Sequence, residues 1–313
     1  MLSGTRGLDC SEAKTYKRPG TCVHRYVRKH HTELAGFTLI ELLVVISVMT
    51  LLMALLLPVL GRVRRQGRAL ACRSNLRQWG LALRSYTAAN EGRLPTCARP
   101  SLGPINVYWL IASDRQWQDM LICPSAQKPS DGSIPPGIQP GETHAPWVGS
   151  ASRAWRWNWL DPSDRDRVVK GSYGLNVRMA WEKIPQEKST ADWQTVDAKH
   201  ASGAPMFFDC AWPWFHTEAD GPFYDEGAGI GPPPESKDFL EKPRRNRTYF
   251  VCMDRHEGGI NMVFFDGSVR KVGLKELWVL KWHRWYNTAN RWTKAGGVRP
   301  EDWPPWMRKF KDY

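Results

Sequence analysis

At 313 residues, the chain is long enough for one large domain or two small ones beyond any membrane segment. Its formal net charge of +13 suits contact with an acidic polymer, anionic headgroups or nucleic acid, and does not select among them. The sequence contains no P-loop, no dinucleotide-binding fingerprint and no G-x-S-x-G nucleophile elbow. These absences exclude the enzyme classes that the motifs define, and we predict a protein that is not an enzyme and has no catalytic residue.

One apolar run lies near the N-terminus, from Phe37 to Leu60. Only five of its 24 residues are not plainly apolar: Thr38, Glu41, Ser47, Thr50 and Pro58. A helix of this length rises about 1.5 Å per residue and therefore spans the roughly 30 Å hydrocarbon core of a bilayer. The sequence contains no second run of membrane length. We therefore predict a single transmembrane helix at 37–60.

Glu41 is the exception within this predicted span, because an ionised carboxylate is costly inside a bilayer. Two explanations are open. The carboxylate lies one turn from the start of the run and can reach the headgroups. Alternatively, a positive group meets it, such as the free α-amine that is made when the chain is cut just before Phe37.

The stretch Gly36-Phe37-Thr38-Leu39-Ile40-Glu41-Leu42-Leu43-Val44-Val45-Ile46 resembles the processing motif of type IV pilins and type II secretion pseudopilins. The resemblance implies that residues 1–36 are a leader, that a prepilin peptidase cuts between Gly36 and Phe37, and that Phe37 is then methylated. It also implies that Glu41 pairs with the amine of a neighbouring subunit during filament assembly. Pro58 matches a helix-kinking proline of the family, since proline lacks the amide hydrogen that a helix needs there.

The same resemblance implies partners and a location. The partners are the prepilin peptidase, other pseudopilin subunits in a homo-polymer or hetero-polymer, and the inner-membrane assembly platform. The location is the bacterial inner membrane, crossed once, with a cytoplasmic N-terminus and a head domain in the periplasm or at the cell surface. Basic residues flank the span on both sides, so the positive-inside rule gives no clear orientation. A conventional secretory signal is disfavoured, because the run is too long and no Ala-x-Ala site follows it.

Residues 61–94 are predicted to continue the same helix with an amphipathic character. Apolar residues recur at three- and four-residue steps, which indicates one buried stripe: Ala69, Cys72, Leu76, Trp79, Leu83 and Tyr86. The sequence Asn90-Glu91-Gly92, followed by Pro95, predicts the end of the helix.

Residues 95–313 are predicted to form the head. Two segments rich in Pro, Gly and Ser, 128–152 and 220–247, are predicted loops, and the apolar run 204–209 is a predicted strand. Two β-rich runs flank Glu-Gly-Gly at 257–259, and Asp266-Gly267 predicts a hairpin with a type I′ turn, which together suggest an antiparallel meander. Residues 274–285 are a predicted short amphipathic helix folded back on the sheet. The predicted fold class is α+β and pilin-like, a long N-terminal helix with a C-terminal antiparallel β-sheet head.

His256, followed by nine residues and then Asp266-Gly267, resembles the H-x9-DG motif of a large bacterial group of pseudopilin-like proteins. Further pieces resemble the same group: Cys72-Arg73-Ser74-Asn75-Leu76-Arg77-Gln78, Cys123-Pro124 and Ser172-Tyr173-Gly174-Leu175-Asn176. The resemblance covers nearly the whole chain after the leader. The chain departs from it in the long leader and in large tryptophan-rich inserts.

Metal binding is weighed at two places, and we predict no metal and no cofactor. A zinc site would need several residues to converge: Cys210, Cys252, His256, Asp266 and His283. The chain lacks the close ligand pairs, such as C-x2-C, that are typical of zinc sites, so His256 is predicted to hydrogen-bond its own hairpin. Calcium is the alternative cofactor, at Glu218, Asp220, Asp225 and Glu226, but these residues match no calcium-loop spacing.

The cysteines and tryptophans leave alternatives open. Cys72, Cys97, Cys123, Cys210 and Cys252 follow the leader, and in an oxidising compartment they would form one or two disulfides with at least one thiol left over. The 17 tryptophans are interpreted as core and inter-subunit packing, with stacking on sugar rings or bases as the alternative.

The sequence therefore predicts a structural pseudopilin-like subunit of a type II secretion or type IV pilus-like system. The alternative is a single-pass, membrane-anchored binding protein for polysaccharide or nucleic acid that does not polymerise, although nucleic acid is not a predicted partner. A membrane-tethered enzyme is a third reading and would need a bound metal or a convergent nucleophile.

Overall fold

The computed structural model describes residues 38–94, 119–126, 149–158, 168–176, 178, 193, 201–215, 230–236 and 247–313. Gly36, Phe37, Cys97 and the four calcium candidates between 218 and 226 lie outside these ranges. The chain divides into two compact units, residues 1–54 and residues 55–313. The described part of the first unit consists of Thr38 and the first 16 residues of one helix, 39–54.

That helix is α1 (Leu39–Ala89), and its start is capped by its own side chains. The backbone N–H of Glu41 donates to Thr38 Oγ1 (3.2 Å), and Glu41 Oε2 accepts from Thr38 N (2.9 Å) and Oγ1 (2.8 Å). This reciprocal arrangement satisfies amide donors that a helix start otherwise leaves unpaired. The helix ends as predicted, at residues with positive φ, Glu91 (55°) and Gly92 (75°), where Gly92 N donates to Thr87 O (2.7 Å).

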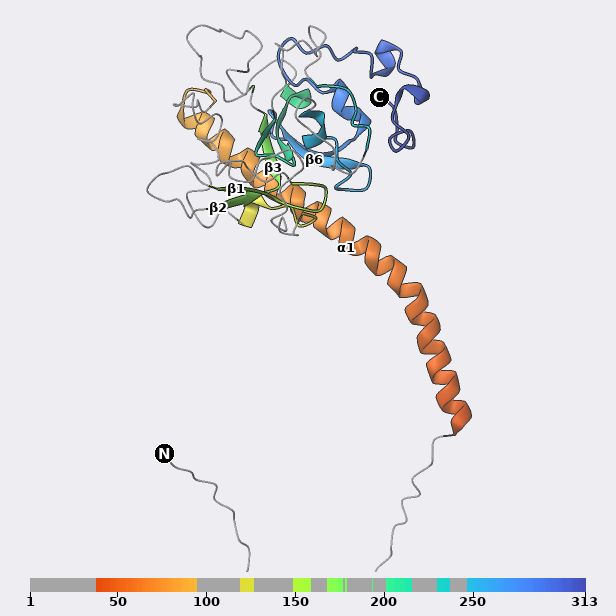
Figure 1. Ribbon diagram of the computed structural model, residues 1–313. Coiled ribbons are helices and arrows are strands. Elements are labelled where there is room, and N and C mark those ends of the chain that lie inside the picture. The colour runs from red at the N-terminus through yellow and green to blue at the C-terminus, as the bar shows by residue number, and fades with distance from the viewer. Residues whose placement is uncertain are drawn as a thin grey trace, which may run out of the picture. The chain divides into compact units, whose positions relative to one another are not determined.

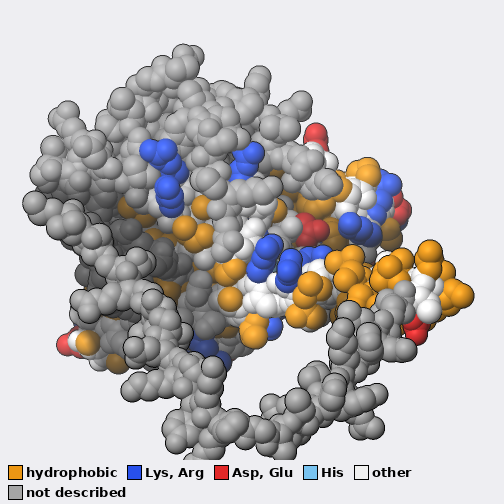
Figure 2. Space-filling view, turned by 90° about the horizontal axis from the view of Figure 1, so that it is seen from below, with side chains coloured by type: hydrophobic (Ala, Val, Ile, Leu, Met, Phe, Trp, Pro, Cys, Tyr) orange, Lys and Arg blue, Asp and Glu red, His pale blue; other side chains and the backbone are white. Residues whose placement is uncertain are grey.

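The N-terminal part of α1 is apolar and uncovered. Its large hydrophobic side chains from Leu39 to Leu60 are all exposed, the least exposed being Val45 at 41%. Among the described residues, α1 is the one helix long and apolar enough to cross a membrane. Figure 2 shows hydrophobic side chains gathered on this part of the helix. The prediction of one candidate membrane span near the N-terminus is confirmed, and the helix continues through Pro58.

A five-stranded sheet lies in the second unit, with the strand order β5-β3-β4-β6-β7. Figure 1 labels two of its strands, β3 and β6. Neighbouring strands are antiparallel, except that β3 and β5 are parallel. Strands β1 and β2 form a separate antiparallel pair. The strands are β1 (Trp155–Asn158), β2 (Val168–Gly171), β3 (Tyr173–Asn176), β4 (Pro205–Asp209), β5 (Trp214–Phe215), β6 (Gly259–Phe264) and β7 (Val269–Gly273). The predicted layout, a long N-terminal helix with a C-terminal antiparallel sheet, is confirmed, as is the strand predicted at 204–209.

Short 3-10 helices complete the described elements. They are η1 (Asp119–Leu121), η3 (Ala201–Gly203), η4 (Arg247–Phe250), η5 (Lys275–Val279), η6 (Lys294–Gly296) and η7 (Pro300–Asp302). The parts of the two predicted loops that the structure describes, 149–152 and 230–236, contain neither helix nor strand.

The C-terminal half of α1 packs on one face of the sheet through the predicted stripe. Trp79 stacks on Phe207 of β4 with ring centroids 5.6 Å apart. Gly80 permits the close approach, because a Cβ at this position would meet Cγ2 of Val263 at 2.7 Å. Cys72, Leu76 and Leu83 are also buried. The first part of α1 is apolar on all sides, whereas the second part is amphipathic and buries one face against the head.

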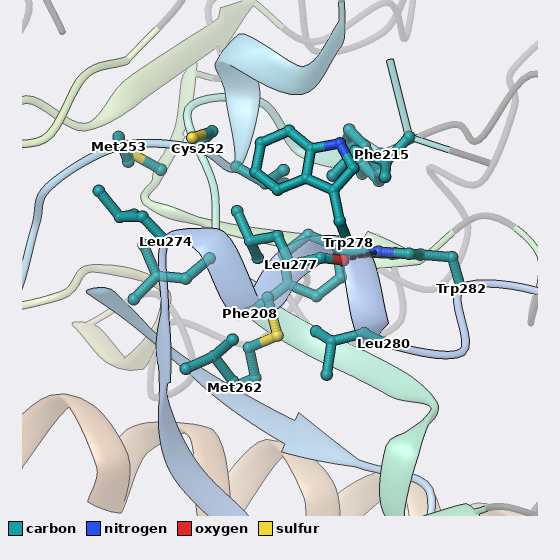
Figure 3. Packing of buried hydrophobic residues seen from close by; sticks show 14 of the residues in the cluster. Phe208, Phe215, Cys252, Met253, Met262, Leu274, Leu277, Trp278, Leu280 and Trp282 are labelled. Carbon is teal, nitrogen blue, oxygen red and sulfur yellow. Dashed lines mark hydrogen bonds between the residues drawn. The ribbon is translucent and has the colours of Figure 1, made fainter. Parts of the chain in front are cut away.

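The opposite face of the sheet carries a second apolar core, built with the C-terminal segment (Figure 3). Phe208, the neighbour of Phe207 in β4, points to this face and meets Trp282 edge to face, with ring centroids 5.3 Å apart. Trp282 Nε1 donates to Leu277 O (2.7 Å), so the buried indole keeps its polar atom paired. The prediction that tryptophans serve core packing is confirmed for the fully buried ones, Trp79, Trp155, Trp278, Trp282 and Trp303.

Two predictions about the C-terminal region need correction. The run 249–253 is not a strand, since it forms part of η4 and an irregular segment, and so no three-stranded meander exists here. A short apolar run does not by itself distinguish a strand from another buried segment. The helix predicted at 274–285 is only η5, because the chain is already extended at Leu280, although η5 does pack on the sheet.

The hairpin of β6 and β7 is confirmed, but the predicted type I′ turn is wrong. Asp266 does not have positive φ, and only Gly267 does, at 81°. Gly267 N donates to Phe264 O (2.8 Å), and Phe264 N donates to Ser268 O (2.9 Å). A turn closed in this way, followed by one left-handed glycine, needs positive φ at a single residue.

Candidate functional site

A cluster of buried polar side chains lies where α1 meets the sheet. Its members are Cys72 of α1, Cys123 just after η1, Asp209 at the end of β4 and His256 in the turn before β6. Each offers one metal-ligating atom, and these atoms all lie within 4.8 Å of one another. Four donors of this kind at this spacing could hold a metal ion. We refer to these four residues as the Cys-Asp-His cluster.

Asp209 is the centre of the hydrogen bonding. Its Oδ1 accepts from Arg255 Nη1 (2.9 Å), and its Oδ2 accepts from Asn261 N (2.8 Å) and lies 3.0 Å from His256 Nε2. Burial opposes ionisation of this carboxyl, but the charges of Arg255 and His256 outweigh burial and lower the pKa of Asp209 to about 2.

Arg255 is a buried guanidinium whose donors are satisfied by backbone carbonyls. Nη2 donates to Ser150 O (2.6 Å), Nε donates to Ala151 O (3.3 Å), and Nη1 is shared between Ser172 O and Asp209. Neither side chain of the Arg255–Asp209 pair has exposed area. Both charges have lost their hydration, so the pair is stable only because its geometry is good and further hydrogen bonds satisfy the remaining donors and acceptors.

The two thiols differ in character. Cys123 Sγ lies 3.4 Å from His256 Nε2 and accepts from Ser125 N (3.4 Å). Burial opposes the charged form, but Cys72 and His256 stabilise the Cys123 thiolate and lower its pKa to about 6. Cys72 Sγ lies 3.6 Å from each oxygen of Asp209. Burial and that carboxylate raise the pKa of Cys72 well above its ordinary value.

His256 is the one residue of the H-x9-DG motif in this cluster. The prediction that its side chain bonds its own hairpin is wrong: the side chain meets Asp209 and Cys123, and only its backbone N–H bonds the hairpin, at Gly259 O (2.9 Å). Burial lowers and Asp209 raises the pKa of His256, and the balance raises it to about 9.

Asp266 and Gly267 lie in the β6–β7 turn and contact α1. Asp266 Oδ1 accepts from Ser268 N (2.9 Å) and Oγ (2.7 Å), which shapes the turn. The carbonyl of Asp266 accepts from Arg84 Nη1 of α1 (2.7 Å). The two ends of the H-x9-DG motif therefore lie at two separate places where α1 meets the sheet.

The other residues considered for zinc do not join His256. Cys252 lies against Met307, with sulfur atoms 3.9 Å apart, and Cys210, Asp266 and His283 are not in the Cys-Asp-His cluster. The four cysteines that the structure describes, Cys72, Cys123, Cys210 and Cys252, are free thiols and not disulfides.

Sequence reasoning missed Asp209, Arg255 and the convergence of the two cysteines. The sequence predicts Cys72 as part of the buried stripe of α1 and both cysteines as pieces of a resemblance and as disulfide candidates, but not as neighbours of Asp209 and His256. A usable signal exists for Asp209, since a charged residue directly after the apolar run Met206-Phe207-Phe208 predicts a buried charge that needs a partner. No such signal singles out Arg255, because the neighbouring Asp254 is exposed.

The predicted assembly residues lie on the exposed part of α1. Glu41 is exposed, and in the single chain its carboxylate bonds Thr38. Pro58 lies inside the helix and is exposed. The predicted cleavage site at Gly36 and Phe37 lies outside the described residues, so the domain boundary at residue 36 stays a prediction.

A second buried histidine, His283, lies apart from the cluster. It is 2% exposed, its Nδ1 accepts from Trp285 N (3.2 Å), and within the described ranges nothing bonds its Nε2. Burial, together with the charges of Arg178 and Lys281, lowers the pKa of His283 to about 4, and the Tyr286 ring lies edge-on to it.

His283 should therefore make the head less stable in acid. The unfolded chain takes up a proton at this histidine near its ordinary pKa of 6.5, whereas the folded chain does so only near 4. The stabilising contribution is fully present above the first value and is lost as the pH falls through the second. Urea unfolding at several pH values in this window should show a shallower pH dependence for His283→Gln than for the original chain. Equal slopes would contradict the assignment.

Comparisons with known proteins identify no family for this chain. A scan against protein-family models finds no match, and searches of curated proteins and of solved structures find none either.

Proposed function

We propose that the chain is a pseudopilin-like structural subunit, cut and N-methylated at Phe37 by a prepilin peptidase and assembled into a periplasmic pseudopilus of a type II secretion or type IV pilus-like system. The observation that carries the proposal is the uncovered apolar part of α1, which is continuous with a part that packs on an α+β head.

The pattern of exposure supports this role. The large apolar side chains between Leu39 and Leu60 are exposed on all sides of α1, so none of the residues that the structure describes covers them. Apolar surface of this extent requires lipid or other copies of the same surface. When a subunit leaves the bilayer and enters a helix bundle, this apolar surface loses its contact with lipid and packs against the same surface of neighbouring subunits.

Glu41 favours packing in a helix bundle over simple contact with lipid. Its carboxylate is the only acidic side chain in the described part of the apolar run, and Thr38 already satisfies two of its hydrogen bonds. Those bonds leave its charge unbalanced, and a low-dielectric surrounding makes an unbalanced charge costly. The free amine of a neighbouring processed subunit is the partner that we propose.

N-terminal mass spectrometry of the protein isolated from native membranes tests the processing step. We expect a terminus at N-methyl-Phe37 in the original chain and also in Glu41→Ala, because Glu41 acts after the cut. An intact leader, or a terminus beyond Leu60, would contradict the proposal and leave an ordinary anchored or secreted domain.

A membrane-anchored binding protein that does not polymerise is the second candidate, because the same apolar part of α1 would also suit a simple lipid anchor. A photo-crosslinking residue placed at Leu52, which is 54% exposed, separates the two. Cross-links between copies of the mature chain support assembly, and cross-links to lipid alone support the anchor.

A further inference from the structure

We infer that Cys72, Cys123, Asp209 and His256 form a tetrahedral zinc site that fastens α1 to the head.

The distances fit such a site. Zinc bonds of about 2.3 Å to sulfur and about 2.0–2.1 Å to nitrogen or oxygen, at tetrahedral angles, separate a sulfur from a nitrogen or oxygen by about 3.5 Å, and a nitrogen from an oxygen by about 3.3 Å. The observed separations are 3.6 Å for Cys72 Sγ to either Asp209 oxygen, 3.4 Å for Cys123 Sγ to His256 Nε2, and 3.0 Å for His256 Nε2 to Asp209 Oδ2. The remaining separations lie within 4.8 Å, whereas no two ligands of a tetrahedral zinc site are more than about 3.8 Å apart, so the four side chains would close around the ion by about 1 Å at most.

The donor types select the metal. Two thiolates and an imidazole are the ligands that zinc takes readily, whereas calcium and magnesium require oxygen ligands throughout. All four residues are buried, so the site has no open position for a substrate. A closed four-ligand site is the structural type and not the catalytic type.

The surroundings balance the charge. Two thiolates and one carboxylate bring three negative charges, which Zn²⁺ and the buried guanidinium of Arg255 together neutralise, because His256 must give up a proton to bind the ion as a neutral ligand. Arg255 holds the Asp209 oxygen Oδ1, which leaves Oδ2 on the side of His256. Ser125 N donates to Cys123 Sγ, as outer groups around metal-bound thiolates do.

The position of the cluster would let a bound ion join distant parts of the chain. Its ligands come from α1, the segment after η1, the end of β4 and the turn before β6, which are far apart in the sequence. One ion would hold all four segments together at the junction of helix and sheet. Metal-binding free energy would then be folding free energy for the head.

The competing chemistry is a disulfide between Cys72 and Cys123. Their two thiols would lose two electrons and two protons to a disulfide-bearing oxidant, which would be reduced to two thiols. The extracytoplasmic location proposed above would favour this reaction. The structure has both residues as free thiols.

The test is metal analysis of the full-length chain, purified in detergent without chelator. We expect one zinc ion per chain in the original protein and in Cys252→Ala, a buried cysteine outside the cluster, and almost none in Cys123→Ala. Reconstitution of the chelator-treated protein with Co²⁺ should give the absorption of tetrahedral cobalt with thiolate ligands, a readout that needs no variant to fold.

Removal of zinc by a chelator should also lower the melting temperature, and restored zinc should recover it. A folded chain that contains no zinc and takes up no cobalt would overturn the inference. A mass lower by two hydrogen atoms, with Cys72 and Cys123 joined in one peptide pair, would overturn it in favour of the disulfide.

Discussion

Glu41→Ala should leave the chain cut and inserted in the membrane but almost absent from filaments. The carboxylate is the only acidic group in the described apolar part of α1, and the proposed partner is the amine of the next subunit. Removing one member of an ion pair in a low-dielectric environment leaves the other charge uncompensated. We therefore expect incorporation to fall by about a hundredfold or more. Quantitative blotting of sheared filaments against the membrane fraction measures this.

Two variants separate the charge from the helix cap at this position. Glu41→Gln keeps a side-chain oxygen that can accept from Thr38 but has no charge, and we expect it to fail in assembly as Glu41→Ala does. Thr38→Val removes the hydroxyl that bonds Glu41 and should cost the helix start about 1 kcal/mol while assembly is retained. If Glu41→Ala enters filaments normally, the proposed pairing is wrong.

Arg255→Met should strongly destabilise the head. It removes the guanidinium that pairs with Oδ1 of the buried Asp209 and the donor to three backbone carbonyls. Breaking a buried pair in this way costs about 3–5 kcal/mol. For a unit of this size the melting temperature should fall on the order of 10 °C. Thermal unfolding followed by near-ultraviolet circular dichroism measures the shift.

The matched control is an exposed ion pair that also involves the turn before β6. Arg65 of α1 bonds Glu257, with side chains 54% and 61% exposed, and Arg65→Met should cost no more than about 1 kcal/mol. Arg255→Lys keeps the charge but not the forked donor geometry, so its stability should lie between those of the original chain and Arg255→Met. Equal losses for Arg65→Met and Arg255→Met would show that the buried pair does not stabilise the head.

Local pattern was informative wherever a structure depends on neighbours in the chain. The apolar run predicted the candidate membrane helix, and the three- and four-residue steps from Cys72 to Leu83 predicted the face of α1 that is buried. Asp266-Gly267 located the hairpin but not its turn type, because the φ angle of Asp266 depends on how the loop closes between β6 and β7. The run at 249–253 was mistaken for a strand, since burial of apolar residues is shared by several conformations.

The sequence by itself determined the long N-terminal helix, its apolar and striped parts, and the strand that carries Phe207 and Phe208, because hydrophobic periodicity and helix capping act over a few residues. Only the tertiary structure decided that Cys72, Cys123, Asp209 and His256 meet. No local spacing links these residues, and their contact follows from packing α1 against the sheet. The pairing of Arg255 with Asp209 belongs to the same class, since a buried charge requires a partner but the sequence does not say which residue the fold will bring to it.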